Sequence, residues 1–570
     1  MAGMSSLNIG VLGLQAASTA LNTTAHNLAN VYTDGYVKQT AVFSDYTYSH
    51  VGNYVNGEML SGLGVYVNAT SHVRDILLDK AYREESGREG FYSAQYSVVQ
   101  EVESILGELE GTTFQSEVND LWNATNELAK DPGNNVSRSE FVMASEKFLN
   151  RSTSIYQDFI NYQKTLDAEI KNTVTDINNL GDTINDLNKK ISSVEAGGIE
   201  TANDLRDERD NALDKLSNLI KVSYTEDDNG ILTVKAEGMP FVTGNAVFHM
   251  GTAELNGAQG STYASAIWPQ VDGQRVFNLT AEEISTDKNS DLGKLKGLLL
   301  ARGNYVAKYT DVPKQANFAT TADYDAAVKT YNSEIDNCAI MKTQALFDTL
   351  VNGIVTAVNN VLSPTTTKAV TVGGVTTNMT VLDVANASFS DDGKQPAQEI
   401  FSRVDTERYT PIVDDSGDTY YVYNDKNVFG GTSLYSCSNL IMNQTILEDY
   451  TKLPLKTSEG EADMKKGEQL MKVWEDAFTN LDPSNLTAKN FKSYYNELVY
   501  EVGNMGDLNK SISLNQATAV SGLETSRQSI MGVASEEELT NMIKFQSAYG
   551  AASRYINVID QMLEHLVTNL

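Results

Sequence analysis

Apolar residues recur in alternating steps of three and four at both ends of this chain. The C-terminal series runs to the last residue and consists of Met542, Phe545, Tyr549, Ala552, Ile556, Ile559, Leu563, Leu566 and Leu570. The N-terminal series has leucine at every seventh position and consists of Leu7, Val11, Leu14, Ser18, Leu21, Ala25 and Leu28. This spacing places each series on one narrow helical face, so the sequence predicts two long terminal helices.

Each terminal helix needs a partner, because neither can remove its apolar stripe from water alone. Ser535 and Glu538 have the spacing of a capping box and predict where the C-terminal helix begins. Pairing the two helices buries roughly nine large side chains at about 1.5–3 kcal/mol each. Ordering about sixty residues costs more, at about 1–2 kcal/mol per residue. We therefore expect a weakly ordered pair that sister chains complete, and we assign the large apolar residues of both series to a subunit interface. A two-helix cap on an ordinary globular protein is the alternative.

Heptads of coiled-coil quality fill the segment from residue 159 to residue 194. Apolar positions repeat every seven residues and are interleaved with a second series, giving Phe159, Leu166, Ile170, Thr173, Ile177, Leu180, Ile184, Leu187, Ile191 and Val194. A return helix is expected over 201–216, with Arg206 and Asp210 as an i,i+4 pair on a solvated face. Other helices are expected from about 74 to 130, from a capping box at Ser137 and Glu140, over 292–302 and over 340–361.

Two segments change to a period of two, which is typical of strands. Val222 and Tyr224 are expected to face Leu232 and Val234 across an Asp-Asn-Gly turn, and residues 365–430 contain further hairpins. The predicted fold is mainly α with inserted β modules: a terminal-helix coiled coil plus an elongated helical bundle carrying nested, discontinuous β-rich domains. The predicted division is 1–34 with 532–570 for polymerisation, 35–221 with 292–364 and 462–531 for the bundle, 222–291 for a β-rich domain and 365–461 for an outer variable β-rich domain.

Composition excludes several classes of function. A net charge of −32 over 570 residues argues against a basic face for nucleic acid or anionic lipid. No run approaches the roughly 20 apolar residues that span a bilayer, so no membrane insertion is expected. The first basic residue is Lys38, so the charged start of a secretory signal peptide is missing. Cys338 and Cys437 are expected to be free core residues.

No pattern of catalytic or metal-binding residues is present in the sequence. The five histidines are scattered, and no HExxH, P-loop, GxSxG or GxGxxG motif occurs. The acidic turns at 227–228, 391–392 and 414–415 lack the register of a calcium loop, although an ion there stays open. We expect no cofactor, no metal and no enzymatic activity.

The residues after the first helix resemble a known family signature. Ala20-Leu-Asn-Thr-Thr-Ala-His-Asn-Leu-Ala-Asn30, then Thr33-Asp-Gly-Tyr-Val-Lys-Gln39, is similar to the N-terminal signature of the flagellar rod, hook and hook-associated proteins. Asp34 replaces the usual proline and Lys38 the usual arginine. The positions carried over are Asn27, Asn30, Gly35, Tyr36 and Gln39. Residues 202–210, 292–302 and 530–549 resemble further segments of the hook-associated branch, and rod and hook proteins generally lack the first of these.

This resemblance implies a structural role at the junction of hook and filament. It implies a helical ring of about eleven copies, contacts with the hook protein and with a second junction protein and the filament, and a cytoplasmic chaperone at the C-terminal helix. It also implies export to the extracellular flagellum without a cleaved signal peptide. A flagellar hook or rod protein is the nearest alternative. An adhesin or enzyme module displayed on a flagellar scaffold is the alternative of another class, with 365–461 as the displayed module.

Overall fold

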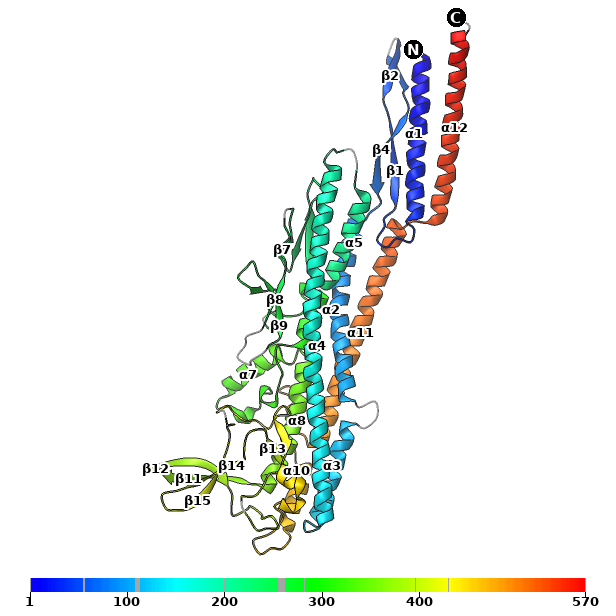
Figure 1. Cartoon of the computed structure of the whole chain (residues 1–570). Coiled ribbons are helices and arrows are strands. Elements are labelled where there is room, and N and C mark those ends of the chain that lie inside the picture. Colours follow the sequence, from blue (N-terminus) through cyan, green and yellow to red (C-terminus); the bar gives the residue numbers. More distant parts are fainter. Residues whose placement is uncertain are drawn as a thin grey trace.

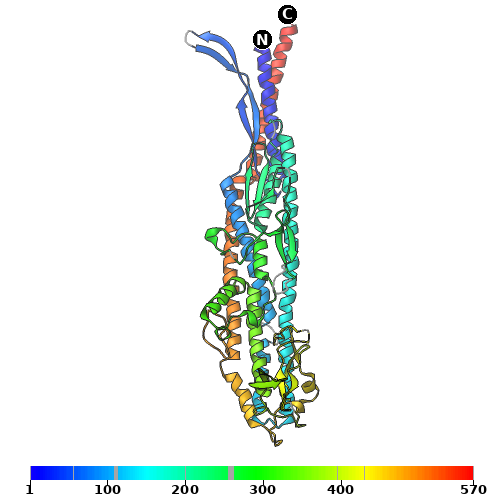
Figure 2. The same cartoon turned by 90° about the vertical axis from the view of Figure 1, so that its left-hand side faces the viewer.

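The protein is a long, narrow molecule in which both chain ends project from the same end of the body (Figure 1). It is described here from a computed structural model that covers residues 2–54, 57–107, 113–198, 201–244, 246–254, 262–280, 282–394, 396–428 and 430–568. A view turned by 90° shows the terminal helices continuing the long axis of the body (Figure 2). The predicted class, mainly α with inserted β modules, is confirmed.

The terminal part consists of two antiparallel helices and a β-ribbon beside them. Helix α1 (Ala2–Ala29) lies along α12 (Ser535–Thr568), while β1 (Gln39–Asp45) pairs with β4 (Val65–His72) next to α1. A second ribbon of β2 (Tyr48–Tyr54) and β3 (Gly57–Gly62) extends the first. A Cβ added at Gly64 would lie 3.5 Å from the Ile9 Cα, so β4 approaches α1 closely. The predicted domain boundary between residues 34 and 35 therefore assigns α1 to one domain and the β1–β4 ribbon to another, although the two lie together.

The body is a bundle of long helices built around α4. Helix α4 (Asn135–Glu195) has 61 residues and spans about 90 Å. The predicted helix at 159–194 is confirmed, and most of its heptad residues are buried, although Val194 is exposed. The bundle is completed by α2 (Ile76–Leu106), α3 (Phe114–Lys130), α5 (Asn203–Leu219), α6 (Lys294–Arg302), α7 (Thr321–Glu334), α8 (Ala339–Leu362), α10 (Met464–Glu475) and α11 (Phe491–Met531).

Two details of the helix prediction were wrong. The expected run over 74–130 is two helices, because α2 ends at Gly107 in the left-handed conformation and α3 begins after Thr113. Helix α4 begins at Asn135, two residues before the predicted Ser137–Glu140 box, and its cap is Asn134, whose side chain accepts a hydrogen bond from the Val136 amide (2.8 Å). Asn134 caps the helix in place of Ser137 because an asparagine side chain can accept a hydrogen bond from the free amides of the first turn as well as a serine side chain can.

Small antiparallel sheets lie beside the helical body. The predicted hairpin is confirmed as β5 (Val222–Glu226) and β6 (Leu232–Ala236), and β7 (Met239–Val242) extends it. Tyr224 lies opposite Val234, whereas Val222 lies opposite Ala236 and Leu232 opposite Glu226, which differs from the predicted pairing. A second sheet contains β8 (Gly251–Glu254), β9 (Ala264–Trp268) and β10 (Gln274–Arg275). The outer module has a sheet ordered β11-β12-β15-β14 and a β13-β16 pair, formed by β11 (Thr365–Val372), β12 (Val375–Leu382), β13 (Phe401–Arg403), β14 (Tyr409–Val413), β15 (Thr419–Tyr423) and β16 (Leu440–Met442), followed by α9 (Gln444–Glu448).

Helix α8 forms the most apolar part of the core. It is long and apolar enough to cross a membrane, which the sequence analysis did not recognise, but 67% of its most apolar window is buried inside the protein. Its burial among the bundle helices identifies it as a core helix. Cys338 and Cys437 are both free and buried, as predicted.

Candidate functional site

Two glycines of α1 lie against side chains of the antiparallel helix α12. A Cβ added at Gly10 would lie 2.7 Å from Cγ1 of Ile556, and one at Gly13 would lie 3.9 Å from the Ala552 Cβ. Glycine at position 10 therefore allows the two helices to come together. It lies within the predicted leucine stripe, three residues after Leu7 and four before Leu14.

The residues that we assigned to the interface are only partly covered in a single chain. Side chains that are half-buried are Leu7, Leu14, Leu21, Leu28, Met542, Phe545, Ile556, Ile559 and Leu563, whereas Val11, Tyr549 and Leu566 are exposed. Leu570 lies outside the described residues. Among the described residues of α12, Glu538 has the one buried side chain. A single copy thus brings the two stripes together but does not enclose them.

Asn27 connects three segments at the base of the terminal helices. Its Oδ1 accepts hydrogen bonds from the Tyr36 hydroxyl (2.8 Å) and the Gln39 amide (3.0 Å). Its Nδ2 donates to the Gln39 carbonyl (2.9 Å) and to Oε2 of Glu538 (3.1 Å). Glu538 is 2% exposed and holds the end of α1, which is a different role from the capping box that we predicted. The signature residues Asn27, Tyr36 and Gln39 therefore form one bonded cluster.

The loop between α1 and β1 owes its shape to the two remaining signature residues. Asn30 donates to the His26 carbonyl (3.0 Å) and accepts from the Thr33 hydroxyl (3.0 Å). Gly35 has φ +76°, and a Cβ there would lie 2.9 Å from Nδ2 of Asn211 on α5. Both the left-handed backbone and the close approach to α5 require glycine.

Four aspartates on one face of α5 hold every segment that passes between the terminal part and the body. Asp204 accepts from Nε2 of Gln39 (2.6 Å) and lies 3.1 Å from Nε2 of His26. Asp207 accepts from the Val37 amide (3.0 Å). These two carboxylates therefore fix the loop that enters β1.

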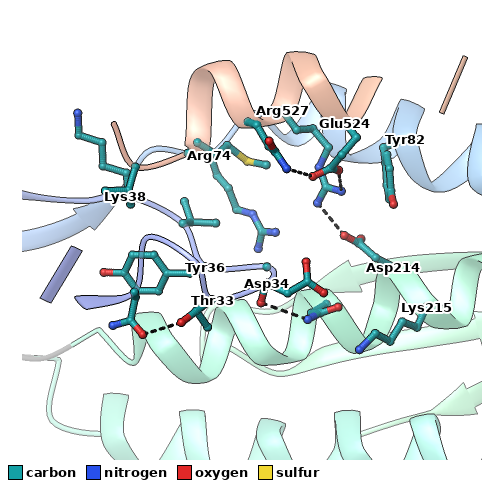
Figure 3. A pocket seen from close by; sticks show the side chains of 18 of the residues that line it. Thr33, Asp34, Tyr36, Lys38, Arg74, Tyr82, Asp214, Lys215, Glu524 and Arg527 are labelled. Atoms are coloured by element: carbon teal, nitrogen blue, oxygen red, sulfur yellow. Dashed lines mark hydrogen bonds and ion pairs between the residues drawn. The ribbon is translucent and has the colours of Figure 1, made fainter. Parts of the chain in front are cut away.

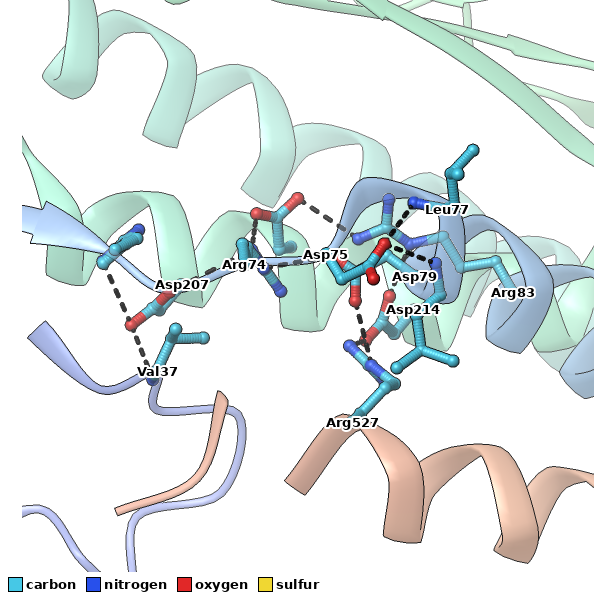
Figure 4. A network of polar contacts seen from close by, with 12 residues as sticks. Val37, Arg74, Asp75, Leu77, Asp79, Arg83, Asp207, Asp214 and Arg527 are labelled. Atoms are coloured by element: carbon cyan, nitrogen blue, oxygen red, sulfur yellow. Dashed lines mark hydrogen bonds and ion pairs between the residues drawn. The ribbon is translucent and has the colours of Figure 1, made fainter. Parts of the chain in front are cut away.

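Asp210 and Asp214 continue this face and bind arginines from two other segments. Figure 4 shows Asp214 with Arg83 and Arg527. Asp210 pairs with Arg74, just before α2, and with Arg83 (3.2 Å). Asp214 binds Arg83 (2.5 Å) and, at the end of α11, Nη2 of Arg527 (2.6 Å). The same face of α5 thus reaches the chain entering α2 and the chain leaving α11.

Asp79 closes this network, which we call the joint (Asp79, Asp204, Asp207, Asp210, Asp214, Arg74, Arg83 and Arg527). Its carboxylate lies 3.1 Å from Nε of Arg74 and 2.9 Å from Nε of Arg527. The guanidinium of Arg527 also lies 4.1 Å from the centroid of the Tyr82 ring. Buried Arg83 and Arg527 are matched here by the buried Asp79 and the half-buried Asp214, and such pairing makes buried charge tolerable.

Burial perturbs the titration of two groups in contact at the joint. Desolvation raises the pKa of Asp207 to about 7. Desolvation, followed by the charge of Arg74, lowers the pKa of His72 to about 4, and His72 Nε2 lies 3.5 Å from Asp207. Both groups therefore favour their neutral forms in the folded protein.

The charged segment of α5 differs from its prediction. The expected pair of Arg206 with Asp210 on a solvated face does not form: Arg206 binds Glu195 (2.7 Å) and Glu226, and Asp210 faces the joint. The signal was present, because the steps of three, three and four from 204 to 214 place four carboxylates on one helical face. Only the distant arginines at 74, 83 and 527 complete the face, and no local pattern connects them to it.

An open cleft of about 1420 Å³ lies beside the joint (Figure 3). Its walls are the loop of residues 30–38, the start of α2, α4, α5, the end of α11 and the connection from α11 to α12. Within the described residues, no group of three or more His, Cys, Asp or Glu side chains could hold a metal ion. The polar groups of the joint bind one another, so the arrangement can fix an orientation and offer a surface.

Comparisons with known proteins match this architecture from end to end. The helical domain of the flagellar hook-associated protein FlgK matches residues 99–373, the basal body rod protein family matches 7–36, and the C-terminal family of the rod proteins FlgEFG matches 526–569. Flagellar hook-associated protein 1 of Bacillus subtilis is 25% identical over 98% of this chain and 96% of its own length. The Escherichia coli protein of the same name is 23% identical over 99% of this chain and 100% of its own length.

A solved structure, the flagellar hook junction protein FlgK from Burkholderia pseudomallei, is also similar, with a TM-score of 0.47 and 13% identity over 79% of this chain and 99% of that one. The matches in sequence cover the helical body and both termini, where the signature cluster and the joint lie. This chain is a flagellar axial protein and belongs to the hook-associated protein 1 family.

Proposed function

We propose that this protein is a structural subunit of the bacterial flagellum at the junction between hook and filament, and that it assembles through α1 and α12. The observation that carries this proposal is the apolar face of α12 that one copy leaves uncovered. Ile543 is 66% exposed and Met562 is 58% exposed, and Leu539, Val558, Leu566 and Val567 are exposed as well. A continuous apolar face on a helix indicates a surface that other chains cover.

Sister copies are the partners that best fit this face. Neighbouring copies in a helical ring bring α1–α12 pairs side by side, so each pair covers the face of the next. We propose about eleven copies per ring, as the family resemblance implies. The hook protein below and a second junction protein with the filament above are the partners proposed at the two ends.

Before assembly, the same face needs protection. We propose that a cytoplasmic chaperone binds α12, because an exposed apolar helix associates prematurely. We further propose export through the flagellar secretion channel without a cleaved signal peptide, to the outside of the cell. The signature cluster around Asn27 then forms when the exported chain folds at the hook end.

The contacts within the chain indicate a separate role for each of its parts. We propose that α1, the β1–β4 ribbon and α12 form the assembly domain, that the helices between α2 and α11 form a rigid body, and that the two β-rich modules face outward. In the outer module, Glu399 accepts from Arg408 (3.0 Å) and from the Tyr435 hydroxyl (2.5 Å), so its buried polar groups bind one another. This favours a structural role over a catalytic one.

Adding the purified chain to isolated hooks tests the proposal. We expect a ring at the hook end in electron cryo-microscopy images, with a gain of helical circular dichroism as the terminal helices become covered. A chain lacking residues 540–570 is expected to stay a soluble monomer that binds neither hook ends nor chaperone. Assembly by the shortened chain would contradict the proposed role of α12.

A further inference from the structure

Two large aliphatic side chains at the start of α2 are exposed although their backbone is held firmly. Ile76 is 75% exposed and Leu77 is 80% exposed. The cap residue Asp75 accepts hydrogen bonds from the amides of Leu77 (3.0 Å) and Leu78 (3.2 Å). The pair therefore forms a fixed apolar protrusion rather than part of a loose loop.

Leu77 points away from the joint, whereas the exposed Ile76 lies on the joint side of α2, three residues before Asp79 and seven before Arg83. On the same first turns of α2, Asp79 and Arg83 face α5 and α11, and Figure 4 shows Leu77 directed away from Arg527. Lys80 is exposed one turn after Ile76 and has no ion-pair partner in the described part of the chain. The first turn of α2 thus exposes two aliphatic groups, and Lys80 on the next turn adds one free positive charge.

The cleft beside the joint has complementary features. Its wall includes the apolar side chains of Leu180, Ile530 and Met531. Asp34, Asp176 and Lys215 also line it, and none of the three has an ion-pair partner among the described residues, so the unpaired charge of the cleft is negative by one. At about 1420 Å³ the cleft has room for several side chains, and neither Ile76 nor Leu77 of the same chain lines it.

We infer that the protrusion of Ile76, Leu77 and Lys80 seats in the joint cleft of a second copy of this chain, with Lys80 facing Asp34 and Asp176. The contact is heterologous, because the protrusion and the cleft are different surfaces of one molecule. One copy can therefore offer its protrusion to one neighbour and its cleft to the other, which is the kind of contact that builds rings and helices. This inference rests on the proposed assembly into a ring.

Charge supports a second copy as the occupant. Copies that each carry a net charge of −32 repel one another, so a productive contact needs local pairing of opposite charges. A lysine on the protrusion and two unpaired aspartates in the cleft supply that pairing. The contact also touches the loop and the α11–α12 connection that the joint holds, so a neighbouring copy would brace the base of the assembly domain.

Cysteine cross-linking tests this contact directly, because Cys338 and Cys437 are buried and do not interfere. Leu77→Cys and Ile530→Cys chains are mixed, assembled on hook ends and oxidised with copper–phenanthroline. We expect a disulfide-linked dimer that needs both variants and exceeds, by about tenfold or more, the yield from Leu77→Cys with Leu486→Cys. Leu486 is exposed and lies outside the cleft, so it is the matched control.

The outcomes separate this inference from the proposed function. If wild-type chains build no ring, the proposed function fails. If the two variants build rings and no disulfide forms between positions 77 and 530 of neighbouring copies, or if Leu77→Cys is captured by another flagellar protein instead, the inference is overturned. A charge exchange adds a second readout: Lys80→Asp should lower ring yield, and combining it with Asp176→Lys should restore it, while monomer circular dichroism stays unchanged. Equal yields for the single and the combined variants would also overturn the inference.

Discussion

Replacing Arg527 by methionine removes one cation from the joint and keeps most of the apolar stem. Arg527 binds Asp79 (2.9 Å), Asp214 (2.6 Å) and Glu524 (3.2 Å), and its side chain is 7% exposed. Removing one partner from a buried ion pair costs about 3–5 kcal/mol when the other charge is left unpaired. Here Asp79 keeps Arg74 and Asp214 keeps Arg83, so we expect a smaller loss of about 2–3 kcal/mol.

This loss should be local, because the network holds the junction of three segments rather than the bundle core. Hydrogen exchange reports such local stability segment by segment. In Arg527→Met we expect amides around residues 72–79 and 528–534 to exchange about 30- to 150-fold faster, which is the same free energy expressed as an equilibrium constant. Amides in the middle of α4 and α8 should be unaffected.

Arg275→Met is the matched control, since Arg275 is exposed on β10 and has no ion pair in the described part of the chain. It should leave exchange at both segments unchanged. High salt should not abolish the difference between the two variants, because buried pairs are screened much less than exposed ones. If Arg527→Met exchanges at the control rate, the joint does not hold the assembly domain in place and the reasoning fails.

Three further predictions concern the joint and the terminal helices. The pKa of Asp207 is about 7 in the folded protein against an ordinary value of 3.8, so between these values the folded state holds a proton that the unfolded state lacks. The stability that this proton contributes is complete below about pH 4 and is lost as the pH rises to 7. The free energy of unfolding of Asp207→Asn, measured with denaturant, should therefore fall below that of wild type by on the order of 2 kcal/mol more at pH 5 than at pH 7.5. An equal difference at both pH values would contradict the assignment. Gly10→Ala should reduce assembly, because the new methyl group meets Ile556, while Gly503→Ala, with nothing within 4 Å, should gain about 0.5–1 kcal/mol in helix stability and assemble normally. Ile543→Ser with Met562→Ser should leave monomer melting unchanged, since both side chains are exposed in one copy, and should abolish ring formation on hooks; normal rings would refute an assembly role for that face.

Patterns with local causes were predictable from the sequence. The terminal helices, the long α4 and the β5–β6 hairpin follow from hydrophobic period and turn residues, and each is a property of neighbours in the chain. The signature residues were also identified in advance, although only as a resemblance. Their physical role, with Asn27 bonded to Tyr36, Gln39 and Glu538, depends on a contact between positions 27 and 538 that no local pattern contains.

The joint was missed for a related reason. A run of alternating charges on a helix is normally solvated, and the expected Arg206–Asp210 pair follows from that rule. In the structure the aspartates of α5 are matched by arginines more than a hundred residues away, at 74, 83 and 527. An apolar stripe is recognised from its spacing along the sequence, but the spacing of charged residues does not show which distant charge each one pairs with. A buried ionic network therefore cannot be distinguished from a solvated one from the sequence alone.

The polar nature of the joint has a consequence for assembly. If the assembly domain were attached to the body through a large apolar interface, folding would draw on the same kind of surface that sister copies need, and the two contacts would compete. Ion pairs and hydrogen bonds are directional, so they fix the orientation of α1 and α12 without covering the apolar face of α12. Exposed Ile543 and Met562 then remain available, while Asp204, Asp207 and Asp214 hold the base in register. Replacing Asp214 and Arg527 by leucine would test this role of the ion pairs. If the assembly domain of this variant stays tightly attached and still builds rings at the wild-type rate, directional polar contacts are not needed to leave the apolar face of α12 free.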